Sequence, residues 1–180
     1  MKLLAGQRSG THARSDALHS TQLGADLGLL LLRLSVGVIT AGHGAQKLFG
    51  LFGGQGLAET GKGFAALGYR PGEFFAGLAG TSELLGGLGL AVGFLTPLAS
   101  AALIGVMINA MVLGASGGLW AQNGGIEYPL TIAVVALAVA AIGPGQFALD
   151  RPFRWRDGGL IWGALALGLG GLGSMVILLL

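Results

Sequence analysis

The chain contains no cysteine and few charged residues. Without thiols it can form no disulfide, no thiolate metal site and no CxxC redox pair, so its own sulfur cannot carry redox chemistry. Charged residues make up 10% of the sequence, against about 25% in soluble domains, and hydrophobic residues make up 53%. This composition excludes an ordinary soluble domain. The few charges also exclude a nucleic-acid-binding surface, so no nucleic acid is expected as a partner.

Common catalytic and metal-binding signatures are also lacking. The sequence has no P-loop and no HExxH motif. Three histidines and four methionines are too few for a convincing haem or copper site, and no metal site is predicted. The glycine-rich runs lie within apolar segments, which argues against phosphate binding.

Glycine is present in excess, at 36 of 180 positions. It follows no G-X-Y period and stands inside apolar runs, which excludes collagen and low-complexity disorder. Small residues let helices approach closely in lipid. The glycine content therefore predicts tightly packed membrane helices, and glycine-rich faces also suit oligomerisation.

Five apolar segments are long enough, or nearly so, to cross a bilayer, which takes about 20 residues. The fourth is the shortest, and the connection at 53–73 carries Phe64, Leu67 and Tyr69 at a spacing that predicts a short amphipathic helix. We predict an all-α polytopic transmembrane bundle. The five segments are Leu27–Phe52, Phe74–Phe94, Pro97–Leu113, Tyr128–Ile142 and Leu160–Leu180.

The distribution of Lys and Arg predicts the orientation. With a cytoplasmic N-terminus, six of these residues face the cytoplasm and three face outward. Residues 1–22 are polar and are expected to form a disordered cytoplasmic tail. The cytoplasmic set is Lys2, Arg8, Arg14, Arg151, Arg154 and Arg156, and the outer set is Lys47, Lys62 and Arg70.

Ionisable residues inside the apolar segments cost about 2.5–3.5 kcal/mol each at a helix centre, so they need a reason to be there. Arg33, Thr40 and Lys47 are spaced seven apart and share one helical face with small glycines. Glu83 lies mid-segment among glycines that would let a neighbouring helix approach. We expect Glu83 to pair with Arg33, because an unpaired buried carboxylate would protonate.

Three further polar residues complete a predicted buried polar network of Arg33, Thr40, Lys47, Glu83, Asn109 and Glu127. Glu127 opens the fourth segment, where it either caps the helix and pairs with Lys47 or forms an outer polar site with Lys47 and His43. His43 is either a hydrogen-bonded residue of the bundle or part of that site. Asn109 either joins helices or contacts a ligand. The candidate catalytic residues are Lys47, Glu83, Glu127 and His43.

Several motifs together resemble the DoxX family. They occur in the expected order over residues 27–150: QKLFGLFGG at 46–54, AALGY at 65–69, GTSELLGGLGLAVGFLTPLA at 80–99, NGGIEYPL at 123–130 and GPGQFALD at 143–150. The resemblance implies a four-helix DoxX-like domain over 23–150 in the bacterial plasma membrane. It places Arg33, Lys47, Glu83, Glu127 and Asp150 on the family's polar positions. Residues 151–180 would add a basic loop and a fifth, C-terminal membrane helix.

The resemblance implies a redox setting and leaves two functions open. The chain is a membrane subunit or scaffold for soluble redox enzymes in oxidative-stress defence, or a membrane enzyme that acts on a lipophilic substrate such as a quinone. Whether the chain is itself an oxidoreductase stays open. In the first case the loop RPFRWRD would contact the partner enzymes. The same loop, through Arg151, Arg154, Trp155 and Arg156, is also expected to anchor the chain at the membrane interface.

Overall fold

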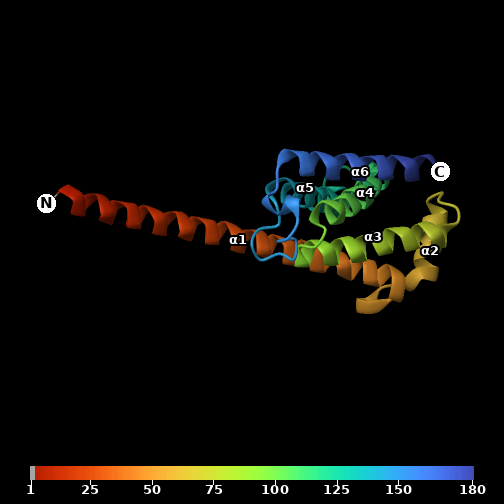
Figure 1. Ribbon diagram of the computed structural model, residues 1–180. Helices are drawn as coiled ribbons and strands as arrows, with labels where there is room; N and C mark the ends of the chain where they lie inside the picture. The colour runs from red at the N-terminus through yellow and green to blue at the C-terminus, as the bar shows by residue number, and fades with distance from the viewer. Residues whose placement is uncertain (1–2) are drawn as a thin grey trace.

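The computed structural model describes residues 3–180, and it describes side chains from His19 onward. The described residues form helices and turns without any strand, which confirms the predicted all-α fold. Every predicted apolar segment is helical, and the 53–73 connection contains a short helix (Figure 1). That helix ends at Ala66, so Phe64 lies in it, whereas Leu67 and Tyr69 of the predicted apolar face follow it. The helices are α1 (Leu3–Phe49), α2 (Gly56–Ala66), α3 (Gly72–Val92), α4 (Thr96–Gly114), α5 (Glu127–Ile142) and α6 (Leu160–Leu179), with short 3-10 turns at Leu51–Gly53, Ala115–Gly117, Ala121–Asn123 and Arg154–Asp157.

Helix α1 starts far earlier than the sequence predicts. Residues 3–22 continue the helix of the first apolar segment, so α1 is 47 residues long and projects from the bundle (Figure 1). This differs from the disordered tail expected over 1–22. The segment contains no proline, so no residue in it blocks a helix that the apolar part has already nucleated.

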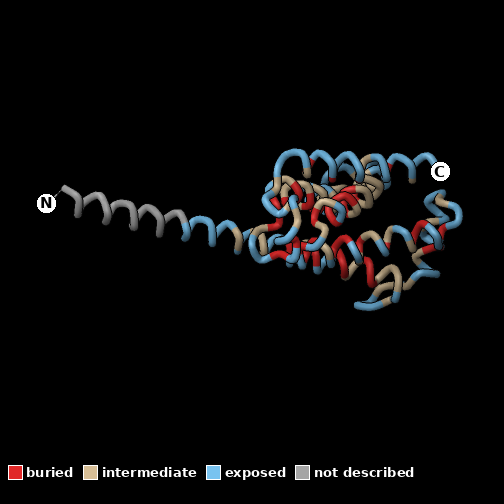
Figure 2. The backbone as a smooth tube through the Cα atoms, viewed as in Figure 1, coloured by how far each residue is buried: buried red, intermediate tan, exposed pale blue. Residues whose placement is uncertain are grey.

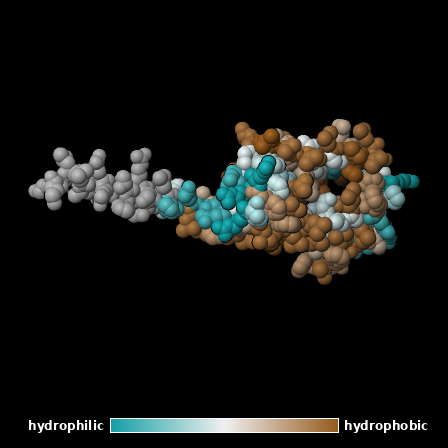
Figure 3. Space-filling view, in the orientation of Figure 1, coloured by the Kyte–Doolittle hydropathy of each residue, from teal (hydrophilic) through white to brown (hydrophobic). Residues whose placement is uncertain are grey.

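Four helical segments are long and apolar enough to cross a membrane: His19–Phe49, Gly72–Val92, Thr96–Gly117 and Leu160–Leu179. Helix α5 is shorter, with 16 residues. Large apolar side chains cover the outside of the bundle (Figure 3), such as Leu31, Leu85 and Leu172, each at least 60% exposed. Buried positions concentrate where helices face one another (Figure 2). This distribution fits a protein embedded in lipid rather than in water.

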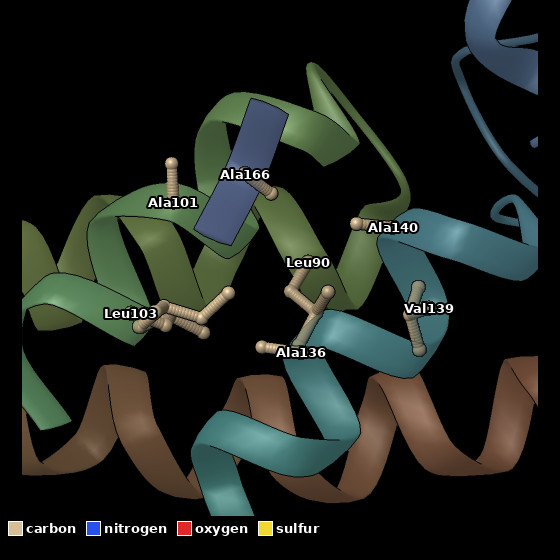
Figure 4. Packing of buried hydrophobic residues seen from close by; sticks show 8 residues of the cluster. Leu90, Ala101, Leu103, Ala136, Val139, Ala140 and Ala166 are labelled. Carbon is tan, nitrogen blue, oxygen red and sulfur yellow. The ribbon is translucent and has the colours of Figure 1, made fainter. Parts of the chain in front are cut away.

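The helices pack in two groups joined by α3 and α4. Helix α1 packs along α3, and α2 folds back onto α3; on the other side α4 packs along both α5 and α6 (Figure 1). A cluster of mostly small buried side chains connects α3, α4, α5 and α6, including Leu90, Leu103, Ala136 and Ala166 (Figure 4). The bundle thus has an α2 end, where α1 finishes and α3 begins, and an opposite end closed by the 143–159 connection.

The α1–α3 contact depends on glycine. A Cβ atom on Gly44 would lie 2.5 Å from the carbonyl oxygen of Gly80, and one on Gly37 would lie 2.5 Å from that of Gly87. These are backbone atoms that cannot move aside. The glycine stripe predicted on the face of Arg33, Thr40 and Lys47 therefore does bring α3 close to that face.

We expect Gly44→Ala to destabilise the bundle, because the added methyl group collides with the α3 backbone. Overpacking of this kind costs about 1–3 kcal/mol, and thermal unfolding in detergent should show a lower midpoint. Gly42→Ala on the same helix is the matched control, since a Cβ there meets nothing within 4 Å. Equal midpoints for the two variants would contradict the assigned helix contact.

Candidate functional site

An ion pair joins α1 to α3 inside the bundle. The Nζ atom of Lys47 donates to Oε2 of Glu83 at 2.5 Å. The Glu83 side chain is 6% exposed and that of Lys47 is 26% exposed. The flexible four-carbon stem of lysine lets its charge reach inward from near the end of α1. The prediction that Glu83 pairs with Arg33 is therefore wrong.

The Lys47–Glu83 pair forms part of the wall of a large cavity of about 700 Å³. The cavity lies between α3, α4 and α6, and Phe64 and Tyr69 reach it from the α2 segment. Figure 3 shows a hollow ringed by hydrophobic side chains on the face between α3 and α6. Ligand sites in proteins commonly measure about 300–1,000 Å³ and combine apolar walls with a few polar groups. This cavity has both properties.

A small cavity of about 170 Å³ lies on the other side of the pair. It is lined by Lys47 and Glu83 together with Thr40, His43 and Tyr128. The rings of His43 and Tyr128 meet edge to face at a centroid distance of 5.5 Å. Apolar residues such as Met107 and Ile132 complete the lining of the small cavity, and the ion pair borders both cavities.

A second polar group on the large cavity, the α4–α6 polar cluster, consists of Tyr69, Asn109 and Ser174. The Asn109 amide nitrogen donates to Oγ of Ser174 at 2.9 Å and to the carbonyl of Gly105 at 3.1 Å. The Tyr69 hydroxyl donates to Oδ1 of Asn109 at 3.5 Å. Asn109 thus links α4 to α6 and borders the cavity, and its contact with a ligand stays a prediction.

Arg33 lies toward the opposite end of the bundle and is completely buried. Its Nη2 donates to the carbonyl of Phe147 at 2.6 Å, whereas Nε and Nη1 have no hydrogen-bond partner in the described part of the chain. The charge of Asp150 acts on the guanidinium. Gly93 ends α3 with φ +65°, and a Cβ there would collide with the guanidinium.

Asp150 caps α4 from a distant part of the sequence. Its two carboxylate oxygens accept the backbone N–H groups of Leu95 and Thr96, each at 2.8 Å. A carboxylate at a helix N-terminus also interacts favourably with the helix dipole. Arg33 and Asp150 therefore hold the 143–150 connection against α1 and α4, well away from the Lys47–Glu83 pair.

The remaining predicted site residues lie apart from the two cavities. Glu127 opens α5, and its backbone N–H bonds to the carbonyl of Leu119; among the described residues its carboxylate forms no ion pair, and Lys47 is bound to Glu83 instead. Arg151, Arg154 and Arg156 are exposed in the loop before α6. Trp155 stacks on Phe153 at a centroid distance of 4.6 Å.

Sequence reasoning missed three residues at the cavities: Tyr128, Ser174 and, as a polar group, Tyr69. Ser174 had a usable signal, because it is an isolated hydroxyl residue in an apolar helix and such residues usually find a hydrogen-bond partner. The sequence predicted Tyr69 only as part of the apolar face of the amphipathic helix, so its hydroxyl group was not considered. The position of Tyr128 beside His43 depends on how α5 turns toward α1, which a single sequence does not reveal.

The fold and the lipid-facing surface define a multi-pass helical membrane protein with an internal apolar cavity. The family model for DoxX matches residues 28–116, from the apolar part of α1 to the turn after α4. Over these residues the chain is similar to the DoxX family. No curated protein and no solved structure matches it. Helices α5 and α6 lie beyond the matched residues.

We expect Asp150→Asn to destabilise the protein by about 1–3 kcal/mol, because the amide group takes the acceptor away from one of the two N–H groups at the start of α4 and places a donor against it. Thermal unfolding and accumulation in membranes would measure the loss. Asp157→Asn is the control, because Asp157 is exposed and pairs only with its neighbour Arg156. Unchanged stability of Asp150→Asn would contradict the assigned role of this carboxylate as the cap of α4.

Proposed function

We propose that the chain binds a lipophilic carbonyl compound of the quinone type in the large cavity and that the Lys47–Glu83 pair holds its polar head and exchanges protons with it. The observation that carries this proposal is the position of the pair, which borders both the large apolar cavity and the small cavity that His43 and Tyr128 also line. A purely structural ion pair would not need an empty space on either side.

The cavity walls suit a ligand that arrives from the bilayer. Most lining groups are apolar, among them Leu78, Val106 and Ile177. The outer faces of α3 and α6 carry exposed leucines, consistent with contact to lipid. A hydrophobic tail would therefore move from one apolar environment to another, while the head group leaves the bilayer for the polar wall.

The pair offers both a hydrogen-bond donor and a proton acceptor. The Lys47 ammonium has three N–H donors, of which one is used by Glu83, so it can donate another to a carbonyl oxygen and polarise it. Glu83 is an acceptor that can take up or release a proton in a low-dielectric site. Positioned this way, Lys47 binds the head group and Glu83 moves the proton.

The small cavity gives that proton a route away from the ligand. His43 borders the small cavity together with Glu83, and the two nitrogens of an imidazole ring can accept a proton on one side and donate one on the other. The Thr40 hydroxyl donates to the carbonyl of Val36 at 2.7 Å. Proton transfer through the small cavity therefore involves His43 and Tyr128 rather than Thr40. Electrons for any quinone reduction would come from a separate redox enzyme, because this chain has no thiol to supply them.

A second candidate function is the anchoring of such soluble redox enzymes. It is favoured by the exposure of Arg151, Arg154 and Arg156 on one short loop. The two functions are compatible, since a quinone-binding subunit needs an electron-donating partner. Affinity purification in mild detergent should recover that partner from the unmodified protein and lose it when all three arginines are replaced by glutamine.

The primary test measures decylubiquinone binding to the purified protein by calorimetry in detergent. Lys47→Met should weaken binding about tenfold or more, because a charge-assisted hydrogen bond contributes about 1.5–3 kcal/mol. Glu83→Gln should bind the compound but release or take up fewer protons as it does so, which calorimetry in buffers of different ionisation enthalpy detects.

The chain supplies a matched control in the Lys62–Glu59 pair of α2, which has the same residue types, a 2.6 Å separation and side chains that are 74% and 57% exposed. Lys62→Met and Glu59→Gln should bind like the unmodified protein. If a folded Lys47→Met variant binds decylubiquinone as tightly as these controls, the proposed site is wrong.

A further inference from the structure

The structure points to a second ligand contact in the large cavity, formed by Ser174 of α6. We propose that this contact makes the site selective for lipophiles that carry two hydrogen-bond acceptors, such as cyclic diones, over those that carry one. This inference rests on the proposed function, because it concerns the ligand of the same cavity. It concerns a part of the chain beyond the residues that the family model matches.

Ser174 has an unused donor. The residue is 2% exposed, yet it borders the large cavity. Its Oγ accepts the hydrogen bond from Asn109, and within the described residues no carbonyl or carboxylate accepts its own O–H. Helical hydroxyls often donate to the carbonyl four residues earlier, as Thr40 and Thr131 do here. Ser174 does not, so its proton is available to a molecule in the cavity.

Asn109 holds this hydroxyl in place. Both hydrogens of its amide are engaged, one by Ser174 and the other by the carbonyl of Gly105. The amide therefore fixes the Ser174 oxygen as an acceptor on one side, which leaves the hydroxyl to donate on another. The backbones of α4 and α6 meet closely here, since a Cβ on Gly170 would lie 2.7 Å from the carbonyl of Ala101. Asn109 is thus the positioning residue, and it holds the Ser174 hydroxyl on a rigid wall of the cavity.

Tyr69 supplies another hydroxyl at the same cluster. Its bond to Asn109 is 3.5 Å long, beyond the usual 2.5–3.0 Å of an O–H···O bond, so little is lost if the hydroxyl turns to a ligand. Phe64 and Phe75 pack on the tyrosine ring at centroid distances of 5.5 and 5.2 Å. The ring stays in place over the cavity while its hydroxyl can exchange partners.

The two polar groups of the cavity come from different helices. Lys47 and Glu83 belong to α1 and α3, whereas Ser174 and Asn109 belong to α6 and α4, and α3 and α6 lie on opposite sides of α4 (Figure 1). Each group presents donors: an ammonium on one side and hydroxyls on the other. A ligand with a single carbonyl can satisfy only one of them, while a ring with two carbonyls can satisfy both.

The experiment compares a dione with a monoketone that has the same bicyclic carbon frame and the same decyl chain. Binding of 2-decyl-1,4-naphthoquinone and of 2-decyl-1-tetralone to the full-length protein in detergent is measured by calorimetry. Ser174→Ala should weaken the dione about fivefold, the usual value of one neutral hydrogen bond, and leave the tetralone unchanged. Ser174→Thr, which keeps the hydroxyl, should restore dione binding.

Ser100→Ala is the matched control, because Ser100 is a fully buried serine of α4 that does not border the cavity. Tyr69→Phe gives an independent variant that keeps the ring, and it should also weaken the dione more than the tetralone. If Ser174→Ala and Tyr69→Phe affect the two ligands equally, or neither ligand, the second contact is wrong while the proposed function stands. If neither ligand binds the unmodified protein, the proposed function itself fails.

Discussion

The structure depends on how closely α1 and α3 approach each other. Gly37 and Gly44 leave no room for a side chain between the two backbones, and this contact brings Lys47 within hydrogen-bond distance of Glu83. An ammonium or a carboxylate alone would be costly in the apolar interior, whereas the bonded pair compensates much of that cost. The remaining large helices pack onto this pair of helices through α4. Both cavities border this ion pair, and their walls come from several helices.

The buried charges at the opposite end of the bundle have a purely structural arrangement. There Arg33 and Asp150 are fully buried, and their hydrogen bonds go to the backbone of the 147 and 95–96 segments. These contacts lock a loop and cap a helix. The Lys47–Glu83 pair differs, because Lys47 keeps unused donors and both side chains face open space. This contrast between two sets of buried charges in one small protein is the main physical support for assigning binding to one set and structure to the other.

Much of the fold could be predicted from the sequence, because long apolar segments and their boundaries follow from hydropathy and from helix-ending glycines. The glycine-lined face of α1 followed from seven-residue spacing. The partner of Glu83 could not be predicted in the same way. Arg33 and Lys47 share that face of α1, and only the register of α3 against α1 decides which of them meets Glu83. The contact of Ser174 with Asn109 depends on the rotation of α6 about its axis, and an apolar helix gives little sign of its buried face. The helical backbone that continues α1 back to Leu3 follows a polar sequence without proline, and polar composition alone does not distinguish such a helix from a disordered tail.

The central claim, that a lipophile occupies the large cavity with its head at Lys47 and Glu83, is tested most directly by photolabelling. An azido derivative of decylubiquinone would be activated with light on the protein in membranes, and the labelled peptides would be identified by mass spectrometry. The account predicts labelling within the cavity-lining parts of α4 and α6, around residues 101–113 and 169–177, that excess decylubiquinone prevents and that Lys47→Met reduces. Labelling confined to lipid-facing positions such as Leu31 and Val38 of α1, unaffected by competitor, would contradict it.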